Sequence, residues 1–248
     1  MRIVSWNIRS GGGRRVDAIA DQLVRWQADV VALCEFRGTP PSQLLAQNLA
    51  ESGLPHQLST ADPEQPARNA LLLASRFPLS QVNLAHAPTE PARWLLAHVA
   101  SQAPFHMGVM HVPNFVTKRK FPFHDAVLTV ADAWQWGPGL FIGDTNTGLP
   151  ILDEETRVFT PREEAWMRRL EELAWGDVFR KLHGETQAYT WYSPNGGNGF
   201  RLDQAFVNPQ LMARVKDMRY VWGQGDGPKE QKRRDALSDH AAILLDLT

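Results

Sequence analysis

Strand-like apolar runs in this sequence repeatedly end on a residue that can bind a metal ion or move a proton. Four such runs end on Asn7, Glu35, His111 and Asp144, and Asn146 lies two residues after Asp144. In a sheet that packs against helices, strand ends meet loops at one rim, so reactive groups placed there share a site. We therefore predict a single site that is assembled from distant parts of the chain.

Two further acids and a histidine belong to the same pattern. Asp203 lies in the strand-like segment 201–207, and Asp239 and His240 come directly before the apolar run 241–247. Carboxylates and an amide suit Mg²⁺, which one or two carboxylates and a substrate phosphate typically hold in proteins. Such an ion activates water and stabilises developing negative charge, while a histidine with a fixed tautomer moves the proton. These residues favour metal-assisted hydrolysis of a phosphate ester.

Each of these residues also has an ordinary structural interpretation. An isolated Asp or Glu at a loop end usually caps a helix or faces solvent, and an Asn there can close a turn. Because the acids, amides and imidazoles occur together, catalysis is the better interpretation. Six other histidines lack this context and are expected at the surface or in structural positions: His56, His86, His98, His106, His124 and His183.

Length and composition are those of a globular protein. The chain has 248 residues, is 43% hydrophobic and 21% charged, and carries a net charge of −1, so any nucleic-acid affinity needs a local basic patch. The single cysteine excludes an internal disulfide framework and a cysteine-based zinc site. Residues 1–7 are too short and polar for the apolar part of a secretory signal, and no apolar stretch approaches 18 residues. We expect one domain over residues 1–248, a monomer in the cytoplasm, with no membrane contact.

The apolar periodicity predicts the elements that position these residues. Strands are expected over 2–8, 29–35, 70–74, 94–99, 105–112, 140–143, 201–207, 218–221 and 241–247. Helices are expected over 16–26, 44–49, 126–136 and 163–174. This order fits two packed sheets with helices outside better than a strict βαβ repeat.

Five short motifs together resemble the endonuclease/exonuclease/phosphatase superfamily, which includes exonuclease III-type repair nucleases, pancreatic deoxyribonuclease and neutral sphingomyelinases. They occur in the order and at the separations typical of that family. The motifs are Ser5-Trp6-Asn7, Leu33-Cys34-Glu35, Gly143-Asp144-Thr145-Asn146, Thr190-Trp191 with Gly199-Phe200-Arg201-Leu202-Asp203, and Ser238-Asp239-His240. The resemblance implies an α/β fold, a four-layered α/β sandwich of two packed mixed β-sheets flanked by helices.

The resemblance also implies a role for each site residue. Glu35 would be a principal metal ligand, with Asn7 and Asp239 near the metal ion. Asp144 and Asn146 would orient or activate the attacking water.

The remaining roles concern protons. His240, paired with Asp203, would polarise the scissile phosphate or carry a proton, and His111 would protonate the leaving oxygen. The sequence departs from the family pattern at Arg9, where repair members often carry Asp or Asn, and at Thr145, which fills a position usually taken by an aromatic residue.

Basic and aromatic residues near the motifs suggest a polyanionic substrate. Lys118, Arg119 and Lys120 are either a solvated basic run or phosphate contacts beside the site. A second basic cluster lies in the Gly-rich segment 223–235 and consists of Lys229, Lys232, Arg233 and Arg234. The expected substrate contacts are Arg9, Lys118, Arg119, Lys120, Trp191 and Arg201, and Trp222 is a further candidate for stacking on a base.

Three functions are consistent with the sequence. The leading hypothesis is a Mg²⁺-dependent enzyme, with Mn²⁺ as a substitute, that hydrolyses phosphodiester bonds in DNA as an endo- or exonuclease with a role in repair. The alternative is the same chemistry on a small phosphoester or a phospholipid head group, for which we find no convincing exposed apolar loop. A catalytically dead binding module on the same fold would have lost the metal and proton-transfer residues, yet these are present.

Overall fold

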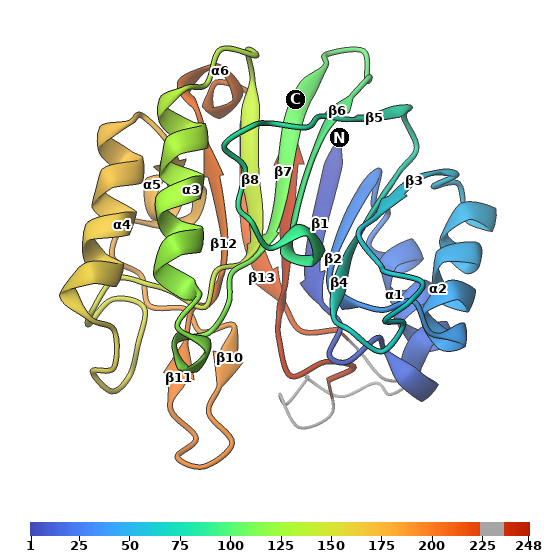
Figure 1. The fold of residues 1–248 in the computed structure, drawn as a ribbon, viewed down its shortest axis with the longest axis horizontal. Coiled ribbons are helices and arrows are strands. Elements are labelled where there is room, and N and C mark those ends of the chain that lie inside the picture. Colours follow the sequence, from blue (N-terminus) through green and yellow to red (C-terminus); the bar gives the residue numbers. More distant parts are fainter. Residues whose placement is uncertain (224–235) are drawn as a thin grey trace.

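Two six-stranded sheets packed against each other form the centre of the computed structural model (Figure 1), which describes residues 1–223 and 236–248. Parallel and antiparallel pairs occur in both sheets. In spatial order the first sheet contains β13 (Val215–Val221), β14 (Ala242–Leu247), β1 (Arg2–Asn7), β2 (Val30–Phe36), β4 (Ala70–Ser75) and β3 (His56–Ser59).

The second sheet begins and ends with short edge strands. In spatial order it contains β5 (Leu79–Gln81), β6 (Trp94–Val99), β7 (Phe105–His111), β8 (Gly139–Asp144), β12 (Asp203–Val207) and β9 (Gly176–Asp177). A separate two-stranded ribbon, β10 (Trp191–Tyr192) with β11 (Gly199–Phe200), projects from the lower rim in Figure 1.

Helices cover the outer faces of both sheets (Figure 1). Helices α1 (Val16–Arg25) and α2 (Pro40–Glu51) pack on the first sheet, and α3 (Lys120–Asp132) and α4 (Pro161–Glu172) pack on the second. The shorter helical segments are α5 (Val178–His183), α6 (Pro209–Met212), η1 (Gly13–Arg15), η2 (Pro91–Arg93) and η3 (Phe115–Thr117). The expected four-layered α/β sandwich is confirmed.

The layers follow from strands whose two faces are both buried. In β1, Ile3 belongs to the apolar core between the sheets, whereas Val4 belongs to the core beneath α1 and α2. In β8, Leu140 and Ile142 face the first sheet and Phe141 faces α3 and α4. Side chains alternate between the two faces of a strand, so continuous apolar runs are needed to fill three cores.

Strand register brings the reactive residues to one rim. β1 and β2 are parallel, so Asn7 lies beside Cys34, one residue before Glu35. β7 and β8 are also parallel and pair His111 with Asp144, while antiparallel β12 begins with Asp203 opposite Asp144. The Trp191–His240 bridge places the ribbon at the same rim.

The main differences from the sequence-based elements are at edges and helix ends. The third long helix runs over Lys120–Asp132 instead of 126–136, because its buried stripe begins at Lys120 and Pro122 is tolerated in the first turn. Several short elements were not expected from the sequence because they carry little periodic signal, namely β3, β5, β9, β10, β11, α5 and α6. Cys34 is buried, as expected, and in the part of the chain that the structure describes no helix is long and apolar enough to cross a membrane.

Gly143 allows β7 and β8 to approach each other next to the site. Its φ is +142°, and an added Cβ would lie 1.9 Å from the carbonyl oxygen of Met110. Because both groups are backbone atoms, only a shift of the strands could relieve the clash. Asp144, the next residue, would shift with them.

We expect Gly143→Ala to lower the free energy of unfolding by at least the upper end of the ~1–3 kcal/mol range for overpacked cores. Gly53→Ala is the matched control, because Gly53 also has a positive φ, of +98°, but open space around it. The control should lose only about 1–2 kcal/mol. Denaturant unfolding of both variants measures the difference, and equal losses would contradict the steric argument.

Candidate active site

A hydrogen bond between Asn7 and Asp144 joins the two sheets at the rim. The amide Nδ2 of Asn7 donates to Oδ2 of Asp144 over 3.0 Å, and both side chains are only 2% exposed. The Asn7 carbonyl accepts the hydroxyl of Ser238 over 2.6 Å, which ties the Ser238-Asp239-His240 segment to β1. Three of the five predicted motifs therefore meet at this bond.

The turn after β8 fixes Asp144 and Asn146 relative to each other. The backbone N–H of Asn146 donates to Oδ1 of Asp144 over 3.0 Å, and its Nδ2 donates to the carbonyl of Val112 over 2.9 Å. Asn146 has φ of 47°, a left-handed conformation that Asn tolerates better than most residues. The hydroxyl of fully buried Thr145 donates to the carbonyl of Leu202 over 2.9 Å, so this residue supports the turn.

Asp203 and His240 form a buried pair across the ends of β12 and β14. Nδ1 of His240 lies 2.9 Å from Oδ2 of Asp203. Burial disfavours the imidazolium, but the charge of Asp203 and its hydrogen bond outweigh burial and raise the pKa of His240 to about 9. Because Nδ1 is used by Asp203, Nε2 is the nitrogen that remains for a substrate oxygen.

His111 lies on the other side of Asp144 and behaves oppositely. Its Nε2 is 3.6 Å from Oδ2 of Asp144, which is too long for a good hydrogen bond. Burial lowers the pKa of His111 to about 4, because Asp144 compensates only in part. Burial also raises the pKa of Asp144, which His240 and His111 partly offset. The site thus combines a neutral imidazole, a charged imidazole and a carboxylate of increased basicity.

Glu35 is aimed by a β-bulge at the end of β2. The pairing of β2 with β4 shifts between Cys34 and Phe36, and Glu35 has φ of 59°. Its Oε2 accepts the N–H of Ser10 over 2.7 Å. A carboxylate residue in this strained conformation is typical of a functional site.

Asp239 is the second carboxylate of the site that solvent can reach, after half-buried Glu35. Its side chain is 42% exposed and lies 3.9 Å from the guanidinium of Arg9. Burial and the charge of Arg9 lower the pKa of Arg15, while the charges of Asp239 and Glu35 both oppose this shift. These two carboxylates therefore lie in the same neighbourhood.

The donor set fits a hard cation that keeps most of its water. In the described part of the chain no group of three or more His, Cys, Asp and Glu side chains is clustered tightly enough to hold a metal ion by itself. Mg²⁺ is commonly held by only one or two carboxylates and by substrate phosphate. Glu35 and Asp239 can supply such ligands, whereas the amide of Asn7 is already bonded to Asp144 and to the N–H of Arg9.

The endonuclease/exonuclease/phosphatase family matches residues 4–240 of this sequence. The chain belongs to this family. Among solved structures, it is similar to a 3′ phosphatase, NExo, from Neisseria bound to a product DNA hairpin and to the 3′-5′ exonuclease NExo from Neisseria meningitidis. Each has 22% identity and a TM-score of 0.80. An AP endonuclease from Archaeoglobus fulgidus has 19% identity and a TM-score of 0.79. All three alignments cover 100% of this chain and 99% of the other.

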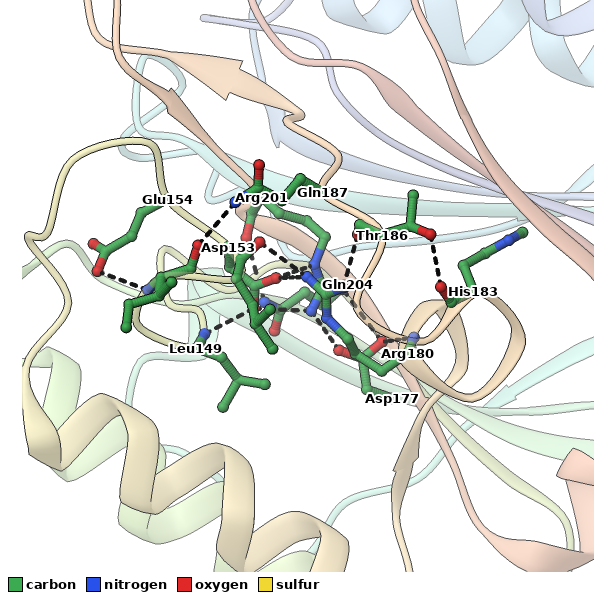
Figure 2. A network of polar contacts seen from close by, with 12 residues as sticks. Leu149, Asp153, Glu154, Asp177, Arg180, His183, Thr186, Gln187, Arg201 and Gln204 are labelled. Carbon is green, nitrogen blue, oxygen red and sulfur yellow. Dashed lines mark hydrogen bonds and ion pairs between the residues drawn. The ribbon is translucent and has the colours of Figure 1, made fainter.

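Two residues that were expected to contact the substrate are instead buried in the interior of the protein. Arg201 is 0% exposed and binds Asp153 and Asp177, as Figure 2 shows. Lys120 is 3% exposed, forms an ion pair with Glu163 and donates to the carbonyl of Asn146. These positions correct the sequence-based expectation, because neither cation can reach a substrate while its donors are engaged in the interior.

The other expected substrate contacts are at the surface or partly buried. Arg9, Lys118 and Arg119 are exposed, and Arg119 donates to Glu90 over 3.1 Å. Trp191 is partly buried, with its ring 6.3 Å from that of His240. The basic residues at 229–234 lie outside the described residues. Trp222 is partly buried beside Tyr192, with the ring centroids 6.2 Å apart.

Three further residues support the site, of which Arg93 and Tyr220 were not expected from the sequence. Arg93 donates to the carbonyl of His111 over 3.2 Å, and the hydroxyl of Thr190 accepts the N–H of Asp203 over 3.1 Å. Tyr220 donates to the carbonyl of Asp203 over 2.8 Å. Thr190 belongs to the Thr190-Trp191 motif, but no sequence signal marked Arg93 or Tyr220, since both donate to backbone carbonyls of distant segments.

We expect NMR titration of the metal-free protein to give two well-separated imidazole transitions, near pH 9 for His240 and near pH 4 for His111. His240→Gln and His111→Gln assign the signals. Because the folded pKa of His240 exceeds its ordinary value of 6.5, its pair stabilises the fold fully below pH 6.5 and loses this contribution as the pH rises through about 9. Two transitions that both lie near 6.5 would contradict the buried geometry.

Proposed function

We propose that this protein is a divalent-metal-dependent phosphodiesterase that acts on DNA. The observation that carries the proposal is the placement of Asp144 among its neighbours. Within the rim, Asp144 is held by Asn7 and Asn146 and lies next to one neutral imidazole, that of His111. The Asp203–His240 pair adds a charged imidazole. This arrangement combines a base for water with donors for a phosphate.

Asp144 is the residue that accepts the proton of the attacking water. Hydrogen bonds from Asn7 and Asn146 fix its carboxylate, and burial raises its pKa toward the range in which a carboxylate is an effective general base. Asn146, held in its left-handed conformation, adds a second polar group beside the same position.

His240 acts on the phosphate. Its Nδ1 is bonded to Asp203, so the protonated ring presents Nε2–H to a non-bridging oxygen and stabilises the charge that develops there. His111, which is neutral at physiological pH, is the second imidazole available for proton transfer to the leaving oxygen.

Glu35 and Asp239 hold Mg²⁺ or Mn²⁺ in this proposal. A bound ion supplies electrophilic activation of the phosphate and lowers the pKa of a coordinated water. Glu35 is aimed by the β-bulge, and Asp239 is exposed at the same rim. Among the described residues, Glu35 accepts the N–H of Ser10 and Asp239 lies near Arg9, which leaves carboxylate oxygens for a metal ion.

DNA is the proposed substrate because of the family and the character of the rim. The similar structures comprise a 3′ phosphatase bound to a product DNA hairpin, a 3′-5′ exonuclease and an AP endonuclease, which supports action at DNA ends or abasic sites in repair. Exposed Lys118 and Arg119 lie eight residues or fewer after His111 and suit phosphate contacts. We further propose that the protein acts as a monomer.

A cleavage panel tests the reaction and its substrate. Asp144→Asn keeps the shape of the side chain but removes the base, so we expect a loss of ~10²–10⁴-fold in kcat. Exposed Asp132→Asn is the control and should retain full activity. The panel comprises linear duplex, single-stranded and abasic-site DNA, RNA and bis-p-nitrophenyl phosphate, each with Mg²⁺, Mn²⁺ or EDTA. Turnover of the small ester alone would contradict the DNA substrate, and activity in EDTA would contradict the metal.

Glu35→Gln tests the metal site separately. The amide oxygen can still accept the N–H of Ser10, so the fold should survive, whereas the loss of charge weakens the hold on a divalent ion. We expect the Mg²⁺ concentration for half-maximal activity to rise at least tenfold, about 1.4 kcal/mol in binding, with partial recovery in Mn²⁺. Exposed Glu64→Gln serves as the control. An unchanged metal requirement would remove Glu35 from the ligand set.

A further inference from the structure

A buried ionic cluster around Arg201 joins segments that are close in sequence to Asp144 and Asp203 (Figure 2). The fully buried guanidinium of Arg201 donates to both oxygens of Asp153, over 2.7 and 3.0 Å, and to both oxygens of Asp177, over 2.5 and 3.2 Å. Arg180 forms a second ion pair with Asp153. None of these four side chains takes part in the proposed reaction.

One side of the cluster closes the loop that follows the Asp144–Asn146 turn. The N–H of Leu149 donates to Oδ2 of Asp153 over 2.7 Å, and the N–H of Asp153 donates to the carbonyl of Leu149 over 2.9 Å. The N–H of Arg201 donates to the carbonyl of Asp153 over 2.9 Å. The segment that begins with Asp144 and Asn146 is thus tied to Arg201, two residues before Asp203.

The other side of the cluster reaches the Asp203–His240 pair. Nη1 of Arg201 donates to the hydroxyl of Tyr220 over 3.3 Å, and that hydroxyl donates to the backbone carbonyl of Asp203 over 2.8 Å. The N–H of Asp203 is held by the hydroxyl of Thr190. Both backbone polar groups of Asp203 are therefore fixed by side chains, and its carboxylate is positioned for His240.

Desolvation makes such a cluster costly unless its geometry is good and its donors are satisfied. A planar guanidinium with several donors can bind two carboxylates and a hydroxyl at once, which a lysine ammonium on a flexible stem does poorly. A cluster that served only to neutralise buried acids would need the charge but not this geometry. Through its three partners, Arg201 connects the Asp144–Asn146 turn with the Asp203–His240 pair.

On this basis we propose that Arg201 is a positioning residue, which acts through Asp153 on the Asp144–Asn146 turn and through Tyr220 on the Asp203–His240 pair. The proposal rests on the proposed function for its kinetic consequences. It assigns no substrate contact to Arg201 and requires only that both segments stay in register.

The test compares Arg201→Lys and Tyr220→Phe with Arg2→Lys. Arg2 is a matched control because its guanidinium also makes two hydrogen bonds to one carboxylate, that of Asp246, over 2.7 and 3.1 Å, at the start of β1. Tyr220→Phe keeps the ring packed on Phe179, 5.0 Å away, and removes only the hydroxyl. It therefore remains informative if Arg201→Lys does not fold.

We expect kcat for DNA hydrolysis to fall by up to ~10²-fold in Arg201→Lys, the effect of a misplacement of about 1 Å, and ~10-fold in Tyr220→Phe, with KM changed less than twofold. Arg2→Lys should keep its kcat. In NMR spectra of the metal-free proteins, the downfield Nδ1 proton of His240, which the bond to Asp203 produces, should shift or broaden in both cluster variants only.

Folded cluster variants with wild-type kcat and an unchanged His240 proton signal would overturn the positioning role. A role in stability alone would lower the melting temperature but leave kcat and this signal at their wild-type values. If the wild-type protein hydrolyses no phosphoester, the proposed function fails, and the proton signal by itself then decides whether Arg201 positions the pair.

Discussion

The apolar contact between the two sheets is the constraint on which the site depends. Side chains alternate along a strand, so the face that places Ile3 in this core also directs Asn7 toward the second sheet. By the same rule Asp144 follows Leu140 and Ile142 on the opposing face. The bond between Asn7 and Asp144 forms where apolar packing ends. The groups proposed to be catalytic come from both sheets and are thus aligned by the packing that stabilises the fold.

Burial at this rim gives two histidines opposite properties. It disfavours the charged ring of both His111 and His240, yet only His240 has a carboxylate at 2.9 Å, which raises its pKa. His111 lies 3.6 Å from Asp144 and keeps a lowered pKa. The closer carboxylate is not the only cause, because Asp144 and Asp239 also raise the pKa of His240, whereas Arg93 and His240 lower that of His111. Such charges act strongly where water is excluded.

Backbone strain and buried charge also concentrate around the rim. Glu35 and Asn146 are held at positive φ by hydrogen bonds to Ser10 and Val112, respectively. Behind them, Arg201 connects the segments that carry Asp144 and Asp203. Such features are costly in isolation and persist where surrounding contacts fix them. The rigid elements of the sandwich supply these contacts from several directions.

The sequence by itself determined the long strands, the layers and the polar residues at the strand ends that we propose as reactive groups. Continuous apolar runs have few other ways to be buried, and residues at their ends must share a rim. Only the tertiary structure decided that Arg201 and Lys120 are interior, since their partners Asp153, Asp177 and Glu163 come from distant segments. A charged residue is predicted to be exposed unless an opposite charge is known to lie beside it. Pairing between distant segments leaves no local periodic signal from which that partner could be predicted.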